Sequence, residues 1–229
     1  MAEQMNVFPE CNVDTNLVSH ILGGYVKHKS CCNEVVKAVN SSETFAIGII
    51  DADKRHATMD NGFYEYELPQ KVDGKSRHIR FFIHQDKTRF IFTVYKAMDS
   101  FIFNAAKEQK ADMTPFNNPT TVKDFLTYTK NVQAETDPKL RHLFAEIKNY
   151  PELLRFRNTL KYLITNKNKV DIDVAKQFFD GRLSKKQSFR LSLICNMKFT
   201  LLRCDFWGLF LPNFQMKVRQ ISKRFTKIT

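Results

Sequence analysis

A continuous apolar run, Phe45–Ile50, ends directly on Asp51. Two residues further along lies Asp53, which is followed by Lys54 and Arg55. The run is rich in β-branched side chains and is bounded by turn residues, a pattern typical of a parallel strand buried on both faces. Such a strand needs a layer of helices on each side of its sheet. The run therefore predicts an α/β layer fold with acids at the end of an inner strand.

The segments around this run predict alternating strands and helices. Before the run we expect a strand at residues 6–8, a helix over 14–22 capped by Asp14 or Thr15, a short strand at 25–28, and a helix over 33–39 capped by Asn33. After it we expect strands at 63–68, 79–84 and 89–95, and a helix from 97 to about 110. The first part of the chain is therefore predicted to be α/β.

From residue 114 onward the pattern is helical. Helix starts are predicted at Thr120 or Thr121, at Asp137 with Pro138, at Pro151 and at Asp171. We therefore predict two domains. Residues 1–112 form an α/β domain with a mostly parallel sheet flanked by helices, and residues 113–229 form a basic, all-helical domain.

The positive charge is concentrated in the second half of the chain. Residues 1–110 hold 14 basic and 14 acidic residues, so the whole net charge of +12 lies in residues 111–229. A basic field of this kind attracts polyanions such as nucleic acid. We predict nucleic acid as a partner, with Lys185, Lys186 and Arg190 among the residues that bind it. The alternative is a solvated surface without a partner.

Composition excludes several classes of protein. The first ten residues lack the basic and apolar regions of a signal peptide, and no run of about 18 apolar residues occurs. The five cysteines are an odd number without paired metal-ligand spacing. We therefore expect a cytoplasmic protein with free thiols, no zinc site and no membrane-spanning segment.

Three acids are predicted at the carboxyl ends of strands, where parallel α/β sheets carry their chemistry. Glu10 follows the first strand, and Asp51 and Asp53 follow the buried run. Clustered carboxylates raise each other's pKa unless a cation lies between them, and Mg²⁺ prefers such oxygen ligands. The alternative is structural: Asp51 caps the next helix, and Asp53 pairs with Lys54 or Arg55.

The stretch FPECNVDTNLV followed by AIGIIDADK resembles the TOPRIM domain, a metal-binding module shared by bacterial primases, topoisomerases and OLD-like nucleases. That family has a glutamate that ends the first strand, often within E-G-x-x-D, and an Asp-x-Asp that ends a later strand. Glu10 and Asp14 match the first motif, and Asp51 and Asp53 match the second. Cys11 departs from the usual glycine. The resemblance covers residues 5–107.

The resemblance implies a Mg²⁺- or Mn²⁺-dependent nuclease that acts on DNA or RNA. Asp51 and Asp53 would hold the metal, and Glu10 would be a ligand or a general acid/base. Lys54 would contact the scissile phosphate, and Arg55 would help to bind the nucleic acid. By analogy, the protein would be an effector in bacterial anti-phage defence, with an ATPase as an expected partner protein.

Two other functions are compatible with the same residues. One is a non-catalytic nucleic-acid-binding or regulatory protein that retains the fold. The other is a haloacid-dehalogenase-type phosphatase, whose Asp-x-Asp also follows a buried strand. That family expects Thr or Val where this chain has Arg55, and it places the motif on the first strand.

Overall fold

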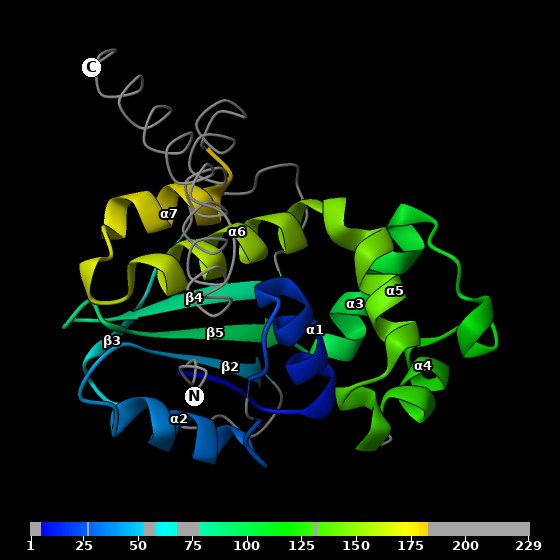
Figure 1. Cartoon of the computed structure of the whole chain (residues 1–229), viewed down its shortest axis with the longest axis horizontal. Helices are drawn as coiled ribbons and strands as arrows, with labels where there is room; N and C mark the ends of the chain where they lie inside the picture. Colours follow the sequence, from blue (N-terminus) through cyan, green and yellow to red (C-terminus); the bar gives the residue numbers. More distant parts are fainter. Residues whose placement is uncertain (1–5, 27, 53–57, 68–77, 131, 183–229) are drawn as a thin grey trace, which may run out of the picture. The chain divides into compact units, whose positions relative to one another are not determined.

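The computed structural model describes residues 6–26, 28–52, 58–67, 78–130 and 132–182 (Figure 1). These residues form a five-stranded mixed sheet and seven α-helices, which confirms the α/β class. Between residues 113 and 182 the described residues form helices and no strand. The predicted all-helical character of residues 183–229 lies outside the described residues.

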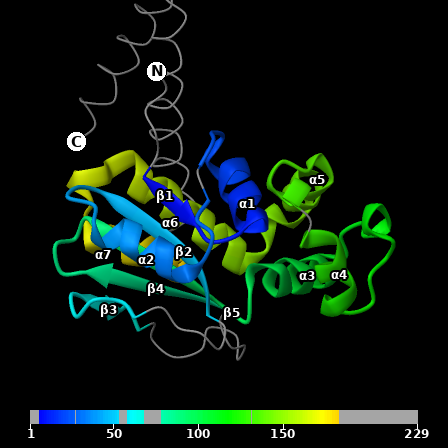
Figure 2. The ribbon, with the colours of Figure 1, turned by 90° about the horizontal axis from the view of Figure 1, so that it is seen from below.

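The sheet joins parallel and antiparallel strands in the order β1-β2-β5-β4-β3. β2 lies between β1 and β5 and is parallel to both, whereas β4 is antiparallel to β5 and to β3. The strands are β1 (Val7–Pro9), β2 (Ala46–Ala52), β3 (Phe63–Glu65), β4 (Ile79–His84) and β5 (Arg89–Tyr95). Figure 2 shows β1 beside β2, at the edge of the sheet. The sheet is therefore mixed, and its parallel part contains both strands that end in acids.

β2 is the buried parallel strand that the sequence predicts. Its first five residues are buried, and Ile47 is in register with Val7 on one side and Phe90 on the other. A Cβ atom added to Gly48 would lie 2.9 Å from the Val35 side chain. The helix α2 (Cys32–Asn40) therefore packs on β2 at a distance that only glycine allows.

The helices beyond α2 begin largely where local signals predict. The side chains of Thr121, Asp137 and Asp171 accept hydrogen bonds from backbone N–H groups in the first turns of their helices, as expected. The remaining helices are α1 (Asn12–Leu22), α3 (Met98–Gln109), α4 (Val122–Thr129), α5 (Pro138–Glu146), α6 (Pro151–Asn166) and α7 (Ile172–Asp180), with 3₁₀ turns η1 (Thr114–Phe116), η2 (Val132–Glu135), η3 (Ile147–Asn149) and η4 (Lys167–Lys169).

Three local predictions in the N-terminal part are wrong. α1 begins after Cys11 and α2 after Cys31, so neither Asp14 nor Asn33 caps its helix. Residues 25, 26 and 28 form no strand, and Tyr25 is 71% exposed. Periodicity does not show whether a short apolar segment finds a neighbouring strand to pair with.

Helices cover both faces of the sheet (Figure 1). On one face, the ring centroids of Phe92 in β5 and Phe156 in α6 lie 5.1 Å apart, and those of Phe81 in β4 and Phe179 in α7 lie 5.2 Å apart. On the other face, α2 packs against Ile50 and neighbouring residues. The sheet core is therefore completed by helices from beyond residue 112.

The described residues up to Arg182 belong to one compact unit. The Asn16 side chain of α1 donates hydrogen bonds to the backbone carbonyls of Ala134, at 2.8 Å, and Asp137, at 3.0 Å. It also accepts one from the Arg141 guanidinium at 3.0 Å. The domain boundary predicted between residues 112 and 113 falls inside this unit.

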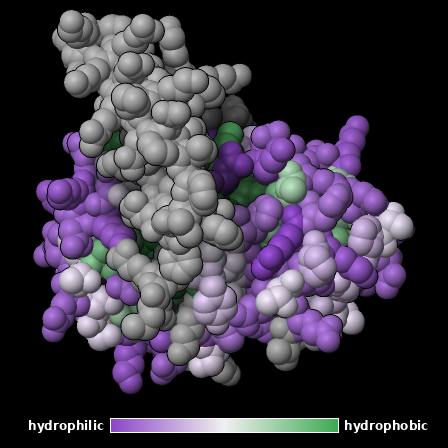
Figure 3. Space-filling model, in the orientation of Figure 1, coloured by the Kyte–Doolittle hydropathy of each residue, from purple (hydrophilic) through white to green (hydrophobic). Residues whose placement is uncertain are grey.

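The surface of the described part is largely hydrophilic on the face seen in Figure 3. Within the described ranges, no helix is both long enough and apolar enough to cross a bilayer. The described cysteines Cys11, Cys31 and Cys32 are free thiols, as expected, and Cys195 and Cys204 lie outside the described residues.

Candidate functional site

Glu10 and Asp51 meet at the carboxyl ends of two adjacent parallel strands. Glu10 follows β1, Asp51 lies near the end of β2, and the two strands pair directly. The backbone N–H of Asp51 donates a hydrogen bond to Oε2 of Glu10 at 2.9 Å. Both side chains are only partly buried. The structure thus brings together two of the three predicted metal ligands.

Asp51 also occupies the N-terminus of α3. Its Oδ1 atom accepts a hydrogen bond from the backbone N–H of Met98, the first residue of that helix, at 2.9 Å. The first part of the structural alternative, in which Asp51 caps the next helix, is therefore observed, while the pairing of Asp53 with Lys54 or Arg55 lies outside the described residues. A carboxylate has about four lone-pair sites, so a cap of this kind leaves capacity for a cation.

Asp14 is a buried acid beside this pair. It lies in the first turn of α1 with 0% exposure, and among the described residues neither of its oxygens has a hydrogen-bond donor of standard geometry. Burial raises the pKa of Asp14 well above its usual value, and the negative charges of Asp51, Asp99 and Glu10 add to the effect. The Cys11 thiol, a weak donor, opposes the shift. An uncompensated buried acid of this kind indicates a place where a positive charge would be favourable.

Asp99 is a fourth acid that the sequence analysis missed. It lies in the first turn of α3, is 9% exposed, and interacts electrostatically with Asp14. Burial raises its pKa, while a hydrogen bond with Thr129 lowers it. Asp99 follows β5, the third parallel strand, whose carboxyl end lies at the same edge of the sheet, and only the pairing of β5 with β2 reveals this position.

The Cys11 thiol is largely buried and lies close enough to Asp14 and Asp51 for their charges to affect it. Burial raises its pKa well above the usual value, and the charges of Asp14 and Asp51 raise it further. A thiol at a helix N-terminus often has a lowered pKa, but here burial and the surrounding acids raise the pKa instead. The raised pKa disfavours the thiolate form of Cys11, which is the form that acts as a nucleophile.

The other predicted site residues lie outside the described residues. These are Asp53, Lys54 and Arg55, which follow β2, and Lys185, Lys186 and Arg190 near the C-terminus. Among the residues that are described, no three His, Cys, Asp or Glu side chains are arranged to hold a metal ion. A metal site that includes Asp53 stays a prediction.

An exposed aromatic residue ends the strand that pairs with β2. Tyr95, the last residue of β5, is in register with Ala52 of β2 and is 53% exposed. The ammonium group of Lys96 lies 5.8 Å from the centroid of the Tyr95 ring. Lys96 has a positive φ of 67°, a left-handed conformation that turns the chain from β5 into α3. Because Asp51 is in register with Val94, strand alternation places the Tyr95 side chain on the face of the sheet opposite to the Asp51 side chain.

Comparisons of the chain with protein-family models, with curated proteins and with solved structures find no match. The resemblance to TOPRIM domains therefore depends on the motifs around Glu10 and Asp51 and on the position of these residues at neighbouring strand ends.

Proposed function

We propose that this chain is a Mg²⁺- or Mn²⁺-dependent nuclease with a TOPRIM-like active site. The observation that carries the proposal is the hydrogen bond between the Glu10 carboxylate and the backbone of Asp51. It joins the two motifs of the resemblance, which are 41 residues apart in the chain. Two parallel strand tips that present acids to one edge are the geometry in which α/β sheets bind charged ligands.

The donor set is compatible with a hard divalent cation. Glu10, Asp51 and Asp53 would hold it, and the buried negative charge around Asp14 would be offset by it. When bound, the ion would neutralise charge that develops on a phosphodiester and lower the pKa of a coordinated water. Glu10 would act as a ligand or general acid/base, while Lys54 and Arg55 would bind the phosphate.

Tyr95 supports nucleic acid as the substrate. Its ring is exposed at the same end of the sheet as the acids, and base stacking on an aromatic side chain is tolerant of sequence. The ammonium group of Lys96, close to the Tyr95 ring, adds a positive charge that would attract the phosphate backbone of the nucleic acid. The basic residues Lys185, Lys186 and Arg190 would extend this binding, although they lie outside the described residues.

A panel of divalent metals on single- and double-stranded DNA and RNA tests the proposal. We expect cutting with Mg²⁺ or Mn²⁺, and its loss in the Asp51→Asn/Asp53→Asn double variant while nucleic-acid binding survives. Glu43→Gln, an exposed acid before β2, is the control and should cut normally. Undiminished cutting by the double variant would refute the metal assignment.

A non-catalytic nucleic-acid-binding protein is the second candidate. It is favoured by the structural roles of the two described acids, since Glu10 accepts a hydrogen bond from the backbone of Asp51 and Asp51 caps α3. Binding without cutting in the presence of every metal tested would favour this candidate.

A haloacid-dehalogenase-type phosphatase would instead hydrolyse a small phosphomonoester. A cytoplasmic role in anti-phage defence, with an ATPase partner, is part of the nuclease proposal.

A further inference from the structure

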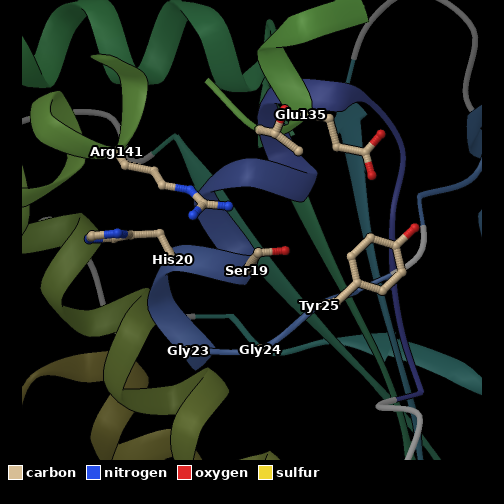
Figure 4. A pocket seen from close by; sticks show the side chains of 8 residues that line it. Ser19, His20, Gly23, Gly24, Tyr25, Glu135 and Arg141 are labelled. Atoms are coloured by element: carbon tan, nitrogen blue, oxygen red, sulfur yellow. The ribbon is translucent and has the colours of Figure 1, made fainter. Parts of the chain in front are cut away.

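A pocket of ≈ 400 Å³ lies between the C-terminal end of α1 and the segment that joins η2 to α5. Its lining includes Ser19 and His20 from α1, Tyr25 shortly after that helix, Glu135 from η2 and Arg141 from α5. Figure 4 shows Arg141 on one side of the pocket and Glu135 and Tyr25 on the other. Pockets for small molecules span about 300–1,000 Å³, so this one is large enough for an organic ligand.

Asn16 holds the two walls of the pocket together. Its side chain donates hydrogen bonds to the backbone carbonyls of Ala134 and Asp137, and it accepts one from Nε of Arg141 at 3.0 Å. These bonds fix η2 and the start of α5 against α1. A site whose walls are already fixed loses less conformational freedom when a ligand binds.

Arg141 contributes a guanidinium group to the lining. Its Nε atom is bonded to Asn16, which orients the plane of the group, and a guanidinium carries several N–H donors in a fixed fork. One bond at Nε therefore leaves donors that can bind an anion. The charge also acts on His20, because burial lowers the pKa of His20 and the positive charge of Arg141 lowers it further. This side of the pocket favours an anionic group.

The other side of the pocket carries a carboxylate. Oε2 of Glu135 lies 3.5 Å from Nδ1 of His28, and the Glu135 side chain is 20% exposed. An ionised carboxylate only accepts hydrogen bonds, and it has the capacity to accept more than one. The pocket therefore favours an anion beside Arg141 and hydrogen-bond donors beside Glu135.

Tyr25 and the glycines before it border the pocket. Gly23 ends α1 with a φ of 67°, in the left-handed region, and no described atom lies within 4 Å of a Cβ added there. Tyr25 is largely exposed, whereas its neighbour Val26 is buried and anchors this segment to the core. An exposed ring on an anchored backbone can stack with the ring system of a ligand.

We propose that this pocket binds a nucleoside monophosphate. The phosphate would lie beside Arg141 and His20, where charge-assisted hydrogen bonds can form. The ribose hydroxyls would donate hydrogen bonds to Glu135, and the base would stack on Tyr25. The site shares no residue with the acids at the sheet edge and does not depend on the nuclease proposal.

The size and charge of the pocket favour this ligand over two others. A single inorganic anion would fill a small part of the 400 Å³ and would contact neither Glu135 nor Tyr25. A nucleic-acid strand that continues from the ribose would bring a second phosphate next to the Glu135 carboxylate, and close like charges oppose binding. The free nucleotide satisfies both sides of the pocket.

Calorimetric titration of the full chain with the 5′-monophosphates of adenosine, guanosine, cytidine and uridine tests the site. We expect the two purine nucleotides to bind most tightly, because a larger base stacks over more of the Tyr25 ring. Tyr25→Ala should weaken the binding of adenosine monophosphate at least about fivefold. Tyr64→Ala, which removes an exposed ring on β3, is the control and should bind as the wild-type chain does.

Ligands that lack one group identify the contacts of Arg141 and Glu135. Arg141→Gln should bind adenosine monophosphate at least about tenfold more weakly, but it should bind adenosine, which has no phosphate, as the wild-type chain does. The wild-type chain should prefer adenosine monophosphate to its 2′-deoxy form, and Glu135→Gln should reduce that preference. Glu43→Gln removes an exposed acid before β2 and should keep it.

The ligand comparisons on the wild-type chain do not depend on the folding of any variant. If none of the four nucleotides binds at millimolar concentration, the site does not exist. Adenosine that binds as tightly as its monophosphate would overturn the phosphate contact. A dinucleotide that binds more tightly than the mononucleotide would assign the pocket to a nucleic-acid strand and overturn the preference for a free nucleotide.

Discussion

The Oε2 atom of Glu10 lies 2.9 Å from the backbone nitrogen of Asp51, so the side chain that follows β1 is bonded to the backbone of β2. The contact gives Glu10 a structural role in addition to its proposed chemical one. An amide oxygen can accept the same hydrogen bond, whereas a methyl group cannot. Substitution can therefore separate the two roles.

Glu10→Gln should keep the fold and lose the proposed nuclease activity. The variant retains an acceptor for the Asp51 N–H but removes the charge, so we expect an activity loss of at least about 100-fold. Glu10→Ala should lose activity equally and also cost about 1–2 kcal/mol in the free energy of unfolding. Denaturant unfolding and metal-dependent cleavage assays measure the two effects. Normal activity in Glu10→Gln would assign the residue to structure alone.

Asp14→Asn should be more stable than the wild-type chain at neutral pH. The folded-state pKa of Asp14 is raised, so below about pH 4 both states are protonated and the variants should be equally stable. As pH rises above the unfolded-state pKa of about 4, the wild type alone loses stability, and the loss is complete once pH exceeds the folded-state pKa. Unfolding free energies measured from pH 3.5 to 8 check this, and a stability difference that does not vary with pH would contradict it.

The wild-type chain and Asp14→Asn also test whether a cation binds at the sheet edge that carries the acids. Mg²⁺ should stabilise the wild-type chain at pH 7 more than it stabilises Asp14→Asn, because only the wild-type chain has a carboxyl group at residue 14 that can ionise when the ion binds. Thermal unfolding with and without Mg²⁺ measures the difference. Equal stabilisation of both chains would mean that the ion binds elsewhere.

Tyr95→Ala should weaken nucleic-acid binding without unfolding the protein. The ring is 53% exposed, so its removal affects little of the core, while the loss of one stacked base costs about 1–3 kcal/mol. Fluorescence anisotropy with labelled oligonucleotides measures the affinity. Tyr64→Ala removes another exposed ring, on β3, and serves as the control. If both variants bind alike, Tyr95 is not a stacking platform.

The Glu152 carboxylate should make stability depend on pH near neutrality. It accepts hydrogen bonds from the backbone N–H groups of His78, at 2.7 Å, and Ile79, at 2.8 Å, and it contacts the His78 ring. The hydrogen bond to Glu152 raises the pKa of His78. The resulting stabilisation is complete below about pH 6.5 and disappears as pH rises through the higher folded-state pKa.

Two variants test this contact between α6 and β4. In His78→Gln, the free energy of unfolding should vary less between pH 6 and 8 than it does in the wild-type chain. Glu152→Gln should cost about 1.5–3 kcal/mol, because Glu152 is buried and its bonds are charge-assisted. A wild-type profile that is already flat between pH 6 and 8 would show that the ring contact does not contribute.

Gly48→Ala should destabilise the protein by about 1–3 kcal/mol through overpacking. The added Cβ would lie 2.9 Å from Cγ1 of Val35 and 3.1 Å from Cγ2 of Val39. Chemical denaturation measures the loss. Combining Gly48→Ala with Val35→Ala should recover part of it, and an unchanged penalty would mean that the contact with α2 is not its cause.

Local signals in the sequence predicted much of the fold. The side chains of Thr121, Asp137 and Asp171 cap the backbone a few residues away, so a short window of sequence contains the whole interaction. The bounds of β4 and β5 were also predicted correctly, because apolar β-rich runs between turn residues define them. These features need no knowledge of distant contacts.

What the sequence could not supply depends on contacts between distant segments. Strand direction is set by which strands become neighbours, so the antiparallel β3 and β4 made the sheet mixed. Asp14 looked like a cap because its type suits that position, but the fold buries it near Asp51 and Asp99. For Asp99 the relevant fact is that β5 lies next to β2, which no local pattern shows.

The hydrogen bonds of Asn16 affect how the sheet edge that carries Glu10, Asp51 and Asp14 can move. It lies two residues after Asp14 on α1, and three hydrogen bonds fasten it to the segment around α5. A shift of that segment would pull on the helix that carries Asp14. The carboxyl groups at the sheet edge are thus physically coupled to the helices beyond residue 112. A protein truncated between these two parts would lose the contacts that support both.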